Sequence, residues 1–170
     1  VAVPITIFAD GENPLWKLWD CCGGTIPEVV IDDAQHGSVA EFQILNNDGA
    51  VLGFNSRPDF SEGGVPFNAS AMLTTGSVSF EMKVVAQPTS STVWTMKIEA
   101  DNNTSFAEVA LNTSNEGVDP VAGEWQTYTF SLSDLTDAGL DISAIDVIMI
   151  FPAWGTGEGA IYRIDNLTIA

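Results

Sequence analysis

The sequence predicts an all-β protein, a two-sheet antiparallel β-sandwich or jelly roll. Short apolar segments recur along the whole chain, and several alternate between apolar and polar residues with period two. Gly, Asn, Asp, Ser and Pro fill the intervals, as turns require. Roughly ten short strands over 170 residues fit a sandwich or jelly roll.

Each predicted strand is an apolar or alternating segment bounded by turn residues. In chain order they are 5–8, 29–31, 39–44, 51–54, 78–84, 93–98, 106–111, 125–132, 147–151 and 161–169. One helical turn is predicted at 132–139, where Ser133 would cap the start and Gly139 would end it. The chain shows no internal repeat and no linker, so we expect a single domain over residues 1–170.

The charge balance narrows the classes of partner. The formal net charge is −18 with only five Lys and Arg residues, so nucleic acids, anionic membranes and strongly anionic polysaccharides are poor partners. No apolar run reaches the ~18 residues that a membrane span requires. The chain begins at Val1 without Met or signal peptide, so we expect a piece excised from a larger secreted protein. We expect that protein to be extracellular or on the outer surface of a bacterium, and the module to be a monomer.

The two cysteines, Cys21 and Cys22, are adjacent. Their Cα atoms are ~3.8 Å apart, which is below the ~4.4–6.8 Å typical of disulfides. A vicinal disulfide would be strained, yet two exposed thiols do not persist in an oxidising compartment. The sequence leaves open a vicinal disulfide or a reduced, partly buried pair.

Tryptophans concentrate in two long loops, which are predicted at 10–28 and 152–159. The first holds Trp16 and Trp19, and the second holds Trp154 between small residues. In an antiparallel sandwich the first and last strands often lie together, so these loops could share one end of the molecule. Trp154 is the best candidate for a ligand-stacking ring, while Trp16 and Trp19 are either exposed or plug the sandwich end.

The two remaining tryptophans lie in predicted strands. Trp125 is expected in the core. Trp94 shares a strand face with Met96 and Ile98, so it is either a core residue or a ligand platform on a sheet. One buried face of an indole, about half of its ~150–250 Å², corresponds to roughly 2 kcal/mol at ~25 cal/mol/Å². Two or three stacked sugars barely exceed the cost of association, which predicts weak binding that repetition along a polymer strengthens.

Polar residues near the tryptophan loops could serve sugar hydroxyls. The candidates are Asp20, Asn55 and Arg57. Arg57 has no evident local partner, so it either offers a fork of donors to hydroxyls or forms a surface salt bridge.

A structural calcium ion is expected. Asp10 and Glu12 follow the first strand, and Asp165 lies in the last strand. If these strands are neighbours, carboxylates and carbonyls, including those of the turn at 32–38, could supply the six to eight oxygens that Ca²⁺ takes. The alternative is a set of plain turn residues in a chain with 23 acidic residues.

Nothing in the sequence supports catalysis. His36 is the only histidine and reads as a surface turn residue, and no nucleophile elbow accompanies it. Glycosidases need two positioned carboxylates, but the Glu-x-Asp-x-x-Glu spacing of sandwich-fold glucanases does not occur. A non-catalytic module is expected.

Several segments resemble the galactose-binding-like domain at the C-terminus of glycoside hydrolase family 3 exo-1,3/1,4-β-glucanases. They are 10–24, with Trp-Asp-Cys-Cys-Gly-Gly at its end, then 123–128, 139–146 and 151–166, with Phe-Pro-Ala-Trp-Gly at its start. The resemblance covers nearly the whole chain and implies an accessory module of a marine bacterial polysaccharide-degrading enzyme. Resemblance to the wider group of jelly-roll carbohydrate-binding modules implies Ca²⁺ at Asp10 and Asp165. It also implies a sugar site at Trp16, Trp19 and Trp154.

We therefore expect a carbohydrate-binding module for a neutral polysaccharide. The expected ligand is a β-glucan, β-1,3- or mixed-linked as in laminarin, and the parent catalytic domain would lie in the same chain. Two alternatives remain: a structural accessory domain packed on a glycoside hydrolase, and an agarose-type galactan binder. The expected carbohydrate-binding residues are Trp154, Trp16, Trp19, Asp20, Arg57 and Trp94.

Overall fold

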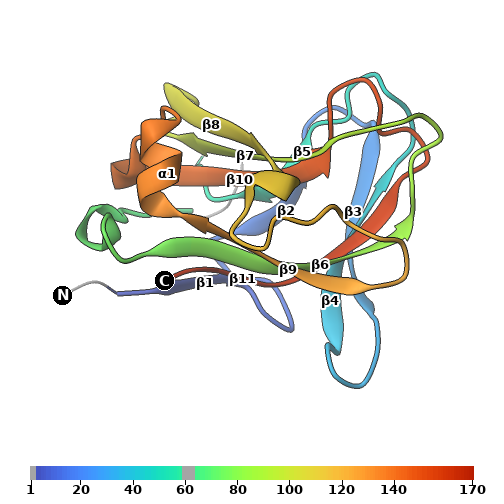
Figure 1. Cartoon of the computed structure of the whole chain (residues 1–170), viewed down its shortest axis with the longest axis horizontal. Helices are drawn as coiled ribbons and strands as arrows, with labels where there is room; N and C mark the ends of the chain where they lie inside the picture. The colour runs from blue at the N-terminus through green and yellow to red at the C-terminus, as the bar shows by residue number, and fades with distance from the viewer. Residues whose placement is uncertain (1–2, 59–63) are drawn as a thin grey trace.

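A computed structural model, which describes residues 3–58 and 64–170, shows two antiparallel sheets stacked face to face (Figure 1). The six-stranded sheet contains β1 (Ile5–Phe8), β3 (Thr25–Ile31), β4 (Ser38–Ile44), β6 (Ser77–Ala86), β9 (Trp125–Ser131) and β11 (Ile161–Ile169). The five-stranded sheet contains β2 (Lys17–Asp20), β5 (Leu52–Asn55), β7 (Trp94–Ala100), β8 (Ser105–Ala110) and β10 (Ile145–Pro152). The predicted antiparallel β-sandwich is confirmed.

The order of strands brings the two ends of the chain together. The six-stranded sheet runs β3-β4-β11-β6-β9, with β1 also paired to β11, and the five-stranded sheet runs β2-β5-β10-β7-β8. Ile5 pairs with Ile169 in the antiparallel ladder of β1 and β11. The expectation that the first and last strands are neighbours is therefore confirmed.

The segment 10–28 differs from the predicted loop. It contains β2, and β3 begins at Thr25. The four residues of β2 alternate across the sheet, so that Leu18 packs against the core while Trp19 lies opposite Gly53 of β5. The glycines and cysteines that follow β2 obscured this short strand in the sequence.

The helical turn forms where it was predicted, with a different cap. Helix α1 spans Leu132–Asp137, and the Ser131 side chain accepts the Asp134 N–H at 3.1 Å, so the cap is Ser131 and not Ser133. Gly139 follows the helix with a φ of 115°, which ends it as expected. Three 3₁₀ turns that the sequence did not predict lie at Ser70–Met72, Leu111–Thr113 and Ile142–Ala144.

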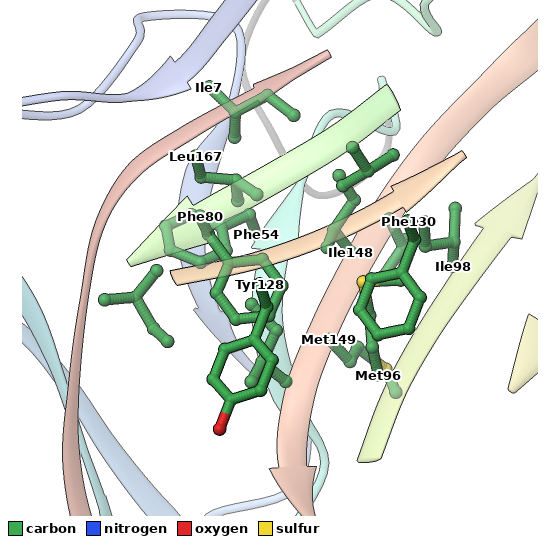
Figure 2. Packing of buried hydrophobic residues seen from close by; sticks show 14 of the residues in the cluster. Ile7, Phe54, Phe80, Met96, Ile98, Tyr128, Phe130, Ile148, Met149 and Leu167 are labelled. Atoms are coloured by element: carbon green, nitrogen blue, oxygen red, sulfur yellow. The ribbon is translucent and has the colours of Figure 1, made fainter. Parts of the chain in front are cut away.

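The core fills the space between the sheets with aromatic and aliphatic side chains (Figure 2). Phe80, Tyr128 and Phe130 of the six-stranded sheet face Ile98 and Ile148 of the five-stranded sheet. Phe80 and Tyr128 stack with ring centroids 5.5 Å apart. Each strand thus presents one row of side chains to the core and leaves the other for the outer faces.

Loops of distant segments meet at the end of the sandwich away from the chain termini (Figure 1). Asn47 accepts the Glu158 N–H at 2.9 Å, and Gly24 touches the backbone of Asp48 and Gly49 so closely that a Cβ would lie 2.7 Å from it. The loop at 45–50 therefore joins the turn after β2 to the loop between β10 and β11. No helix in the described ranges is long and apolar enough to cross a membrane.

Candidate functional site

The outer face of the five-stranded sheet carries the most exposed indole among the described residues. Cross-strand pairing fixes which side chains share this face. Trp19 lies opposite Gly53, Met149 opposite Lys97, and Lys97 opposite Glu108. Successive residues of a strand point to opposite faces, so these side chains point away from the core residues Phe54, Ile148 and Ile98.

Trp154 is held on this outer face by two contacts. Its ring centroid lies 4.2 Å from that of Phe151 in β10, and its indole N–H donates to Oε1 of Glu108 in β8 at 2.8 Å. The residue is nevertheless 46% exposed. The ring is therefore anchored along one edge and one face and accessible elsewhere, as a stacking platform requires. The expectation of an exposed Trp154 is confirmed.

Trp19 lies at the opposite edge of the same face. It is half-buried, on edge strand β2, and packs in part against the core. Its neighbour across the ladder, Gly53, has no side chain and sits against the backbone of Ile148 and Met149. Two indoles therefore border this face, and Gly53, which has no side chain, lies between them. Strands β2 and β8 are four strand spacings apart, which is about 19 Å.

Paired charges cover the part of this face around Lys97 and Glu99. Lys97 Nζ lies 3.0 Å from Glu99 Oε2 and 4.6 Å from the ring centroid of Phe106, which is 47% exposed. The Arg57 guanidinium contacts Glu99 and donates from Nε to Asp146 Oδ2 at 3.3 Å. Burial raises the pKa of Asp146 and outweighs the opposing effects of the Asn102 N–H and of Arg57. Arg57 thus forms a partly buried ion-pair network, the salt-bridge alternative of the two considered.

Two expected sugar-binding residues, Trp16 and Trp94, are buried, which corrects their assignment, and a third, Asp20, is engaged within a turn. Trp16 is fully buried in the core, because it follows a turn that tucks its ring between the sheets. Trp94 points inward, 4% exposed, with its ring 5.0 Å from that of Tyr162. Asp20 uses its carboxylate to accept the Gly23 N–H and the Thr25 hydroxyl, which closes the turn after β2.

Three residues of this face were missed. Phe106 and Glu108 alternate with the buried Ala107 on β8, and Lys97 alternates with core residues on β7. The period-two pattern of the predicted strands at 93–98 and 106–111 carried this signal. Only the pairing of β8 with β7, and of β7 with β10, shows that they share the face of Trp154.

A polar hollow of about 550 Å³ lies at the loop end. It is lined by the Ser- and Thr-rich segment 87–93 together with the edge of Trp94, Asn112, Asp119 and Pro120. Trp94 donates from Nε1 to Gln87 Oε1 at 3.2 Å, so its only polar atom is already engaged. The hollow therefore offers hydroxyl and amide groups but no exposed aromatic ring.

Of the three expected calcium ligands, Asp10 and Asp165 lie together and line one hollow, and Glu12 lies apart from them. Asp10 donates its backbone N–H to Asp165 Oδ1 at 3.3 Å, while its own Oδ1 accepts the Ser38 N–H at 2.8 Å. Glu12 is exposed and lines a different hollow. His36 and Glu81 also lie close to Asp165. The hollow that Asp10 and Asp165 line also presents Gly37 and Asn166, and a calcium ion there, with its six to eight oxygens, remains a prediction.

Two further expectations are wrong around Asp165. His36 is 7% exposed and is not a surface turn residue, because the turn between β3 and β4 folds it onto the sheet. Trp125 is half-buried on the outer face of the six-stranded sheet and outside the core. The two rings stack with centroids 3.9 Å apart and an interplanar angle of 14°.

Cys21 and Cys22 form a vicinal disulfide in the structure, the first of the two alternatives. Both residues are exposed, at the turn that connects β2 to β3. Gly49 packs against this turn with a φ of 70°, and a Cβ at this position would lie 3.1 Å from the Cβ of Cys22.

Comparison of structures places this fold among known sandwiches. The family 30 carbohydrate-binding module of a cellulosomal cellulase from Clostridium thermocellum has 14% identity, a TM-score of 0.66 and coverage of 99% of this chain and 97% of that chain. An exo-β-agarase has 15% identity and a TM-score of 0.66, with 97% of this chain and 24% of that chain covered. An exo-1,3/1,4-β-glucanase from a Pseudoalteromonas species has 12% identity and a TM-score of 0.65, with 100% and 21% covered.

Sequence comparison adds no closer relative. No family model matches the chain, and no curated protein is similar to it in sequence. The chain spans about a quarter or less of the agarase and the glucanase that it resembles. The structural likenesses, at 12 to 15% identity, establish the fold of the chain, which is the two-sheet sandwich that family 30 carbohydrate-binding modules also have.

Proposed function

We propose that this chain is a non-catalytic module that binds a neutral polysaccharide on the outer face of the five-stranded sheet. The observation that carries the proposal is Trp154, an indole that Phe151 and Glu108 hold in place while 46% of the residue stays exposed. A fixed indole loses little conformational freedom when a sugar ring stacks on it. Trp19 and Phe106 extend the apolar surface of the same face.

The charges of this face suit an uncharged ligand. Lys97 pairs with Glu99, and Arg57 pairs with Glu99 and Asp146, so each charge has a partner already. Such pairs still offer unused donor and acceptor positions to hydroxyl groups. An anionic chain would meet a protein of net charge −18, whereas a neutral glycan meets no repulsion.

Among neutral polymers we propose a β-glucan, β-1,3- or mixed-linked. Likeness to the fold of an exo-1,3/1,4-β-glucanase and of a cellulase module supports this choice. Likeness to an exo-β-agarase supports an agarose-type galactan as the second candidate. In either case the module would act outside the cell, beside a catalytic domain of the same chain, and keep that domain near its polymer.

Affinity gel electrophoresis against laminarin, mixed-linkage β-glucan and agarose tests the proposal. We expect the wild type to be retarded by at least one β-glucan, Trp154→Ala to lose most of the retardation, and Phe106→Ala to lose part of it. The matched control is Ile31→Ala, which removes an exposed apolar side chain from the other sheet, 72% exposed, and should migrate as the wild type does.

Each other outcome has a defined meaning. Retardation by agarose alone would replace the glucan by the galactan. Absence of retardation by every neutral polymer would support the structural accessory role instead. Equal losses in Trp154→Ala and Ile31→Ala would contradict the assignment of the site to the five-stranded sheet.

A further inference from the structure

We propose that the vicinal disulfide of Cys21 and Cys22 is a contact subsite for the polysaccharide, at which the sulfur atoms and their methylene groups meet the C–H face of a sugar ring. The subsite rests on the proposed function, because it extends the glycan site on the outer face of the five-stranded sheet. It carries that site beyond the tryptophans to the turn between β2 and β3.

The strand register places the disulfide on the same face as Trp19. The ladder of β2 and β5 pairs Trp19 with Gly53, and it continues with a hydrogen bond from the Cys21 N–H to the Val51 carbonyl oxygen at 3.0 Å. Residues two apart in a strand point to the same side of a sheet. The side chain of Cys21 therefore follows that of Trp19 on the outer face, at the end of β2.

A row of apolar side chains connects the disulfide to Trp154. The register between β10 and β5, continued toward the loop end, brings Phe151 opposite the half-buried Val51. Phe151 in turn lies against Trp154, with ring centroids 4.2 Å apart. Cys21, Val51 and Phe151 thus form one row across three neighbouring strands, about 10 Å long. A polymer that lies along this row meets Trp154 at one end and the disulfide at the other.

The disulfide is both exposed and held in place. Asp20 closes the turn around it by accepting the Gly23 N–H and the Thr25 hydroxyl. Gly49 packs so closely against the turn that a Cβ there would lie 3.1 Å from the Cβ of Cys22. Both cysteines are nevertheless exposed. Because the covalent bond already fixes the two side chains, a sugar that packs on them has few rotamers to order.

The chemistry of a disulfide between adjacent residues suits a contact surface. Such a bond closes almost no chain, so its effect is local and it contributes little to global stability. Sulfur is polarizable and only a weak hydrogen-bond acceptor. An exposed disulfide therefore presents an apolar surface that gains dispersion contacts with the C–H groups of a saccharide. Two thiols in its place would rotate independently, and a bound sugar would have to order them.

Protection from reduction tests the contact directly on the wild-type chain. Dithiothreitol converts the disulfide to two thiols and is itself oxidised to a cyclic disulfide, and mass spectrometry with a thiol label follows the rate. We expect saturating soluble laminarin to slow the reduction about 5-fold or more, because a sugar ring covers the sulfur atoms. Dextran at the same mass concentration should not slow it. Agarose oligosaccharides replace laminarin if agarose is the polymer that retards the wild type.

Affinity measurements on variants give a second test. We expect the double change of Cys21→Ala and Cys22→Ala to weaken laminarin binding about 3- to 10-fold, through lost contacts and a less ordered turn. The matched control is Ile26→Ala. Ile26 is the second residue of β3, so it lies close to the same turn in sequence, but it belongs to the other sheet and is 43% exposed. This variant should bind as the wild type does.

The outcomes separate the subsite from the proposed function. If neither laminarin nor agarose oligosaccharides bind the wild type, the proposed function fails and the subsite fails with it. If the wild type binds and Trp154→Ala binds more weakly, while saccharide leaves the rate of reduction unchanged, only the subsite is overturned. A weaker double variant with an unchanged rate of reduction also overturns it, because the disulfide would then support the turn without touching the sugar. If circular dichroism shows that the double variant does not fold, the protection assay decides alone.

Discussion

The indole N–H of Trp154 donates a 2.8 Å hydrogen bond to the carboxylate of Glu108, which lies 46 residues earlier on edge strand β8. This contact ties the loop between β10 and β11 to the far edge of the five-stranded sheet. It uses the only polar atom of the indole, so the ring can offer a ligand only the face away from Phe151 and its remaining edge. Glu108 is therefore a positioning residue for the proposed stacking platform.

Removal of the hydrogen bond between Glu108 and Trp154 should weaken glycan binding without unfolding the protein. We expect Glu108→Ala to weaken the affinity for the bound glucan about 5-fold, because the free indole samples more rotamers and must be ordered on binding. Glu108→Gln keeps an acceptor oxygen and should stay within about 2-fold of the wild type. Titration with soluble oligosaccharides measures both. Equal affinities for Glu108→Ala and the wild type would contradict the positioning role.

Truncation of Trp16 should destabilise the fold much more than truncation of Trp154. Trp16→Ala removes a fully buried ring from the core and should lower the free energy of unfolding by about 3–5 kcal/mol. Trp154→Ala removes a half-exposed ring and should cost less than about 1.5 kcal/mol. Urea unfolding followed by far-ultraviolet circular dichroism measures both values. A small loss for Trp16→Ala would show that its ring is not part of the core.

Gly53 should not tolerate a side chain. A Cβ at this position would lie 2.5 Å from the Ile148 carbonyl oxygen and 3.0 Å from Met149 Cα, so the backbone of two central strands would have to separate. We expect Gly53→Ala to cost about 2–3 kcal/mol of stability. Gly155→Ala is the control, because its φ of 77° is strained for alanine while the space around it is open, and about 1 kcal/mol is expected. Similar costs for both would contradict the steric argument.

The vicinal disulfide should contribute little to global stability. Cys21 and Cys22 are adjacent, so the bond closes almost no chain and removes little entropy from the unfolded state. We expect reduction, or the double change of both residues to Ser, to alter the free energy of unfolding by less than about 1 kcal/mol. Intact mass spectrometry with a thiol label checks that the bond is present before reduction. A loss of several kcal/mol would show that the turn after β2 depends on it.

Local sequence patterns predicted the layers of this fold better than the location of its polar clusters. Alternation and turn residues predicted most strands, and the pairing of the first and last strands followed from general sandwich topology. Trp16 and Trp19 are three residues apart and look equivalent in sequence. The short strand β2 separates them, since it turns Trp19 outward while Trp16, just before it, is buried.

The polar clusters could not be predicted from the sequence, because long-range strand pairing brings their members together. Asp165 was recognised as a candidate metal ligand, but its neighbours Glu81 and His36 lie 84 and 129 residues away in the chain, and only the register of β6 and β11 brings them together. Likewise, Arg57 reads as an isolated cation until the pairing of β5 with β10, and of β10 with β7, brings Asp146 and Glu99 close to it. Such pairs have no local signal because each member follows the pattern of its own strand.

Asp32 should control the loss of stability in acid. Its side chain is only 2% exposed and accepts hydrogen bonds from Lys83 at 3.1 Å and from Arg163 at 2.6 Å. Burial raises the pKa of Asp32, but the hydrogen bonds from Arg163 and Lys83 outweigh burial and leave the pKa below its ordinary value. A carboxyl whose pKa is lower in the folded state stabilises the fold above its unfolded pKa of ~3.9. That stabilisation is lost as the pH falls through the folded pKa.

Asp32→Asn should therefore cost about 1–3 kcal/mol at pH 6, where it leaves two partly exposed cations short of one partner. The difference from the wild type should shrink as the pH falls below ~4, because the wild-type carboxylate becomes protonated there as well. Urea unfolding at a series of pH values measures this difference, with the exposed Asp137→Asn as the matched loss of one negative charge. A difference between wild type and Asp32→Asn that stays constant down to pH ~2.5 would show that the ion pairs of Asp32 do not stabilise the fold.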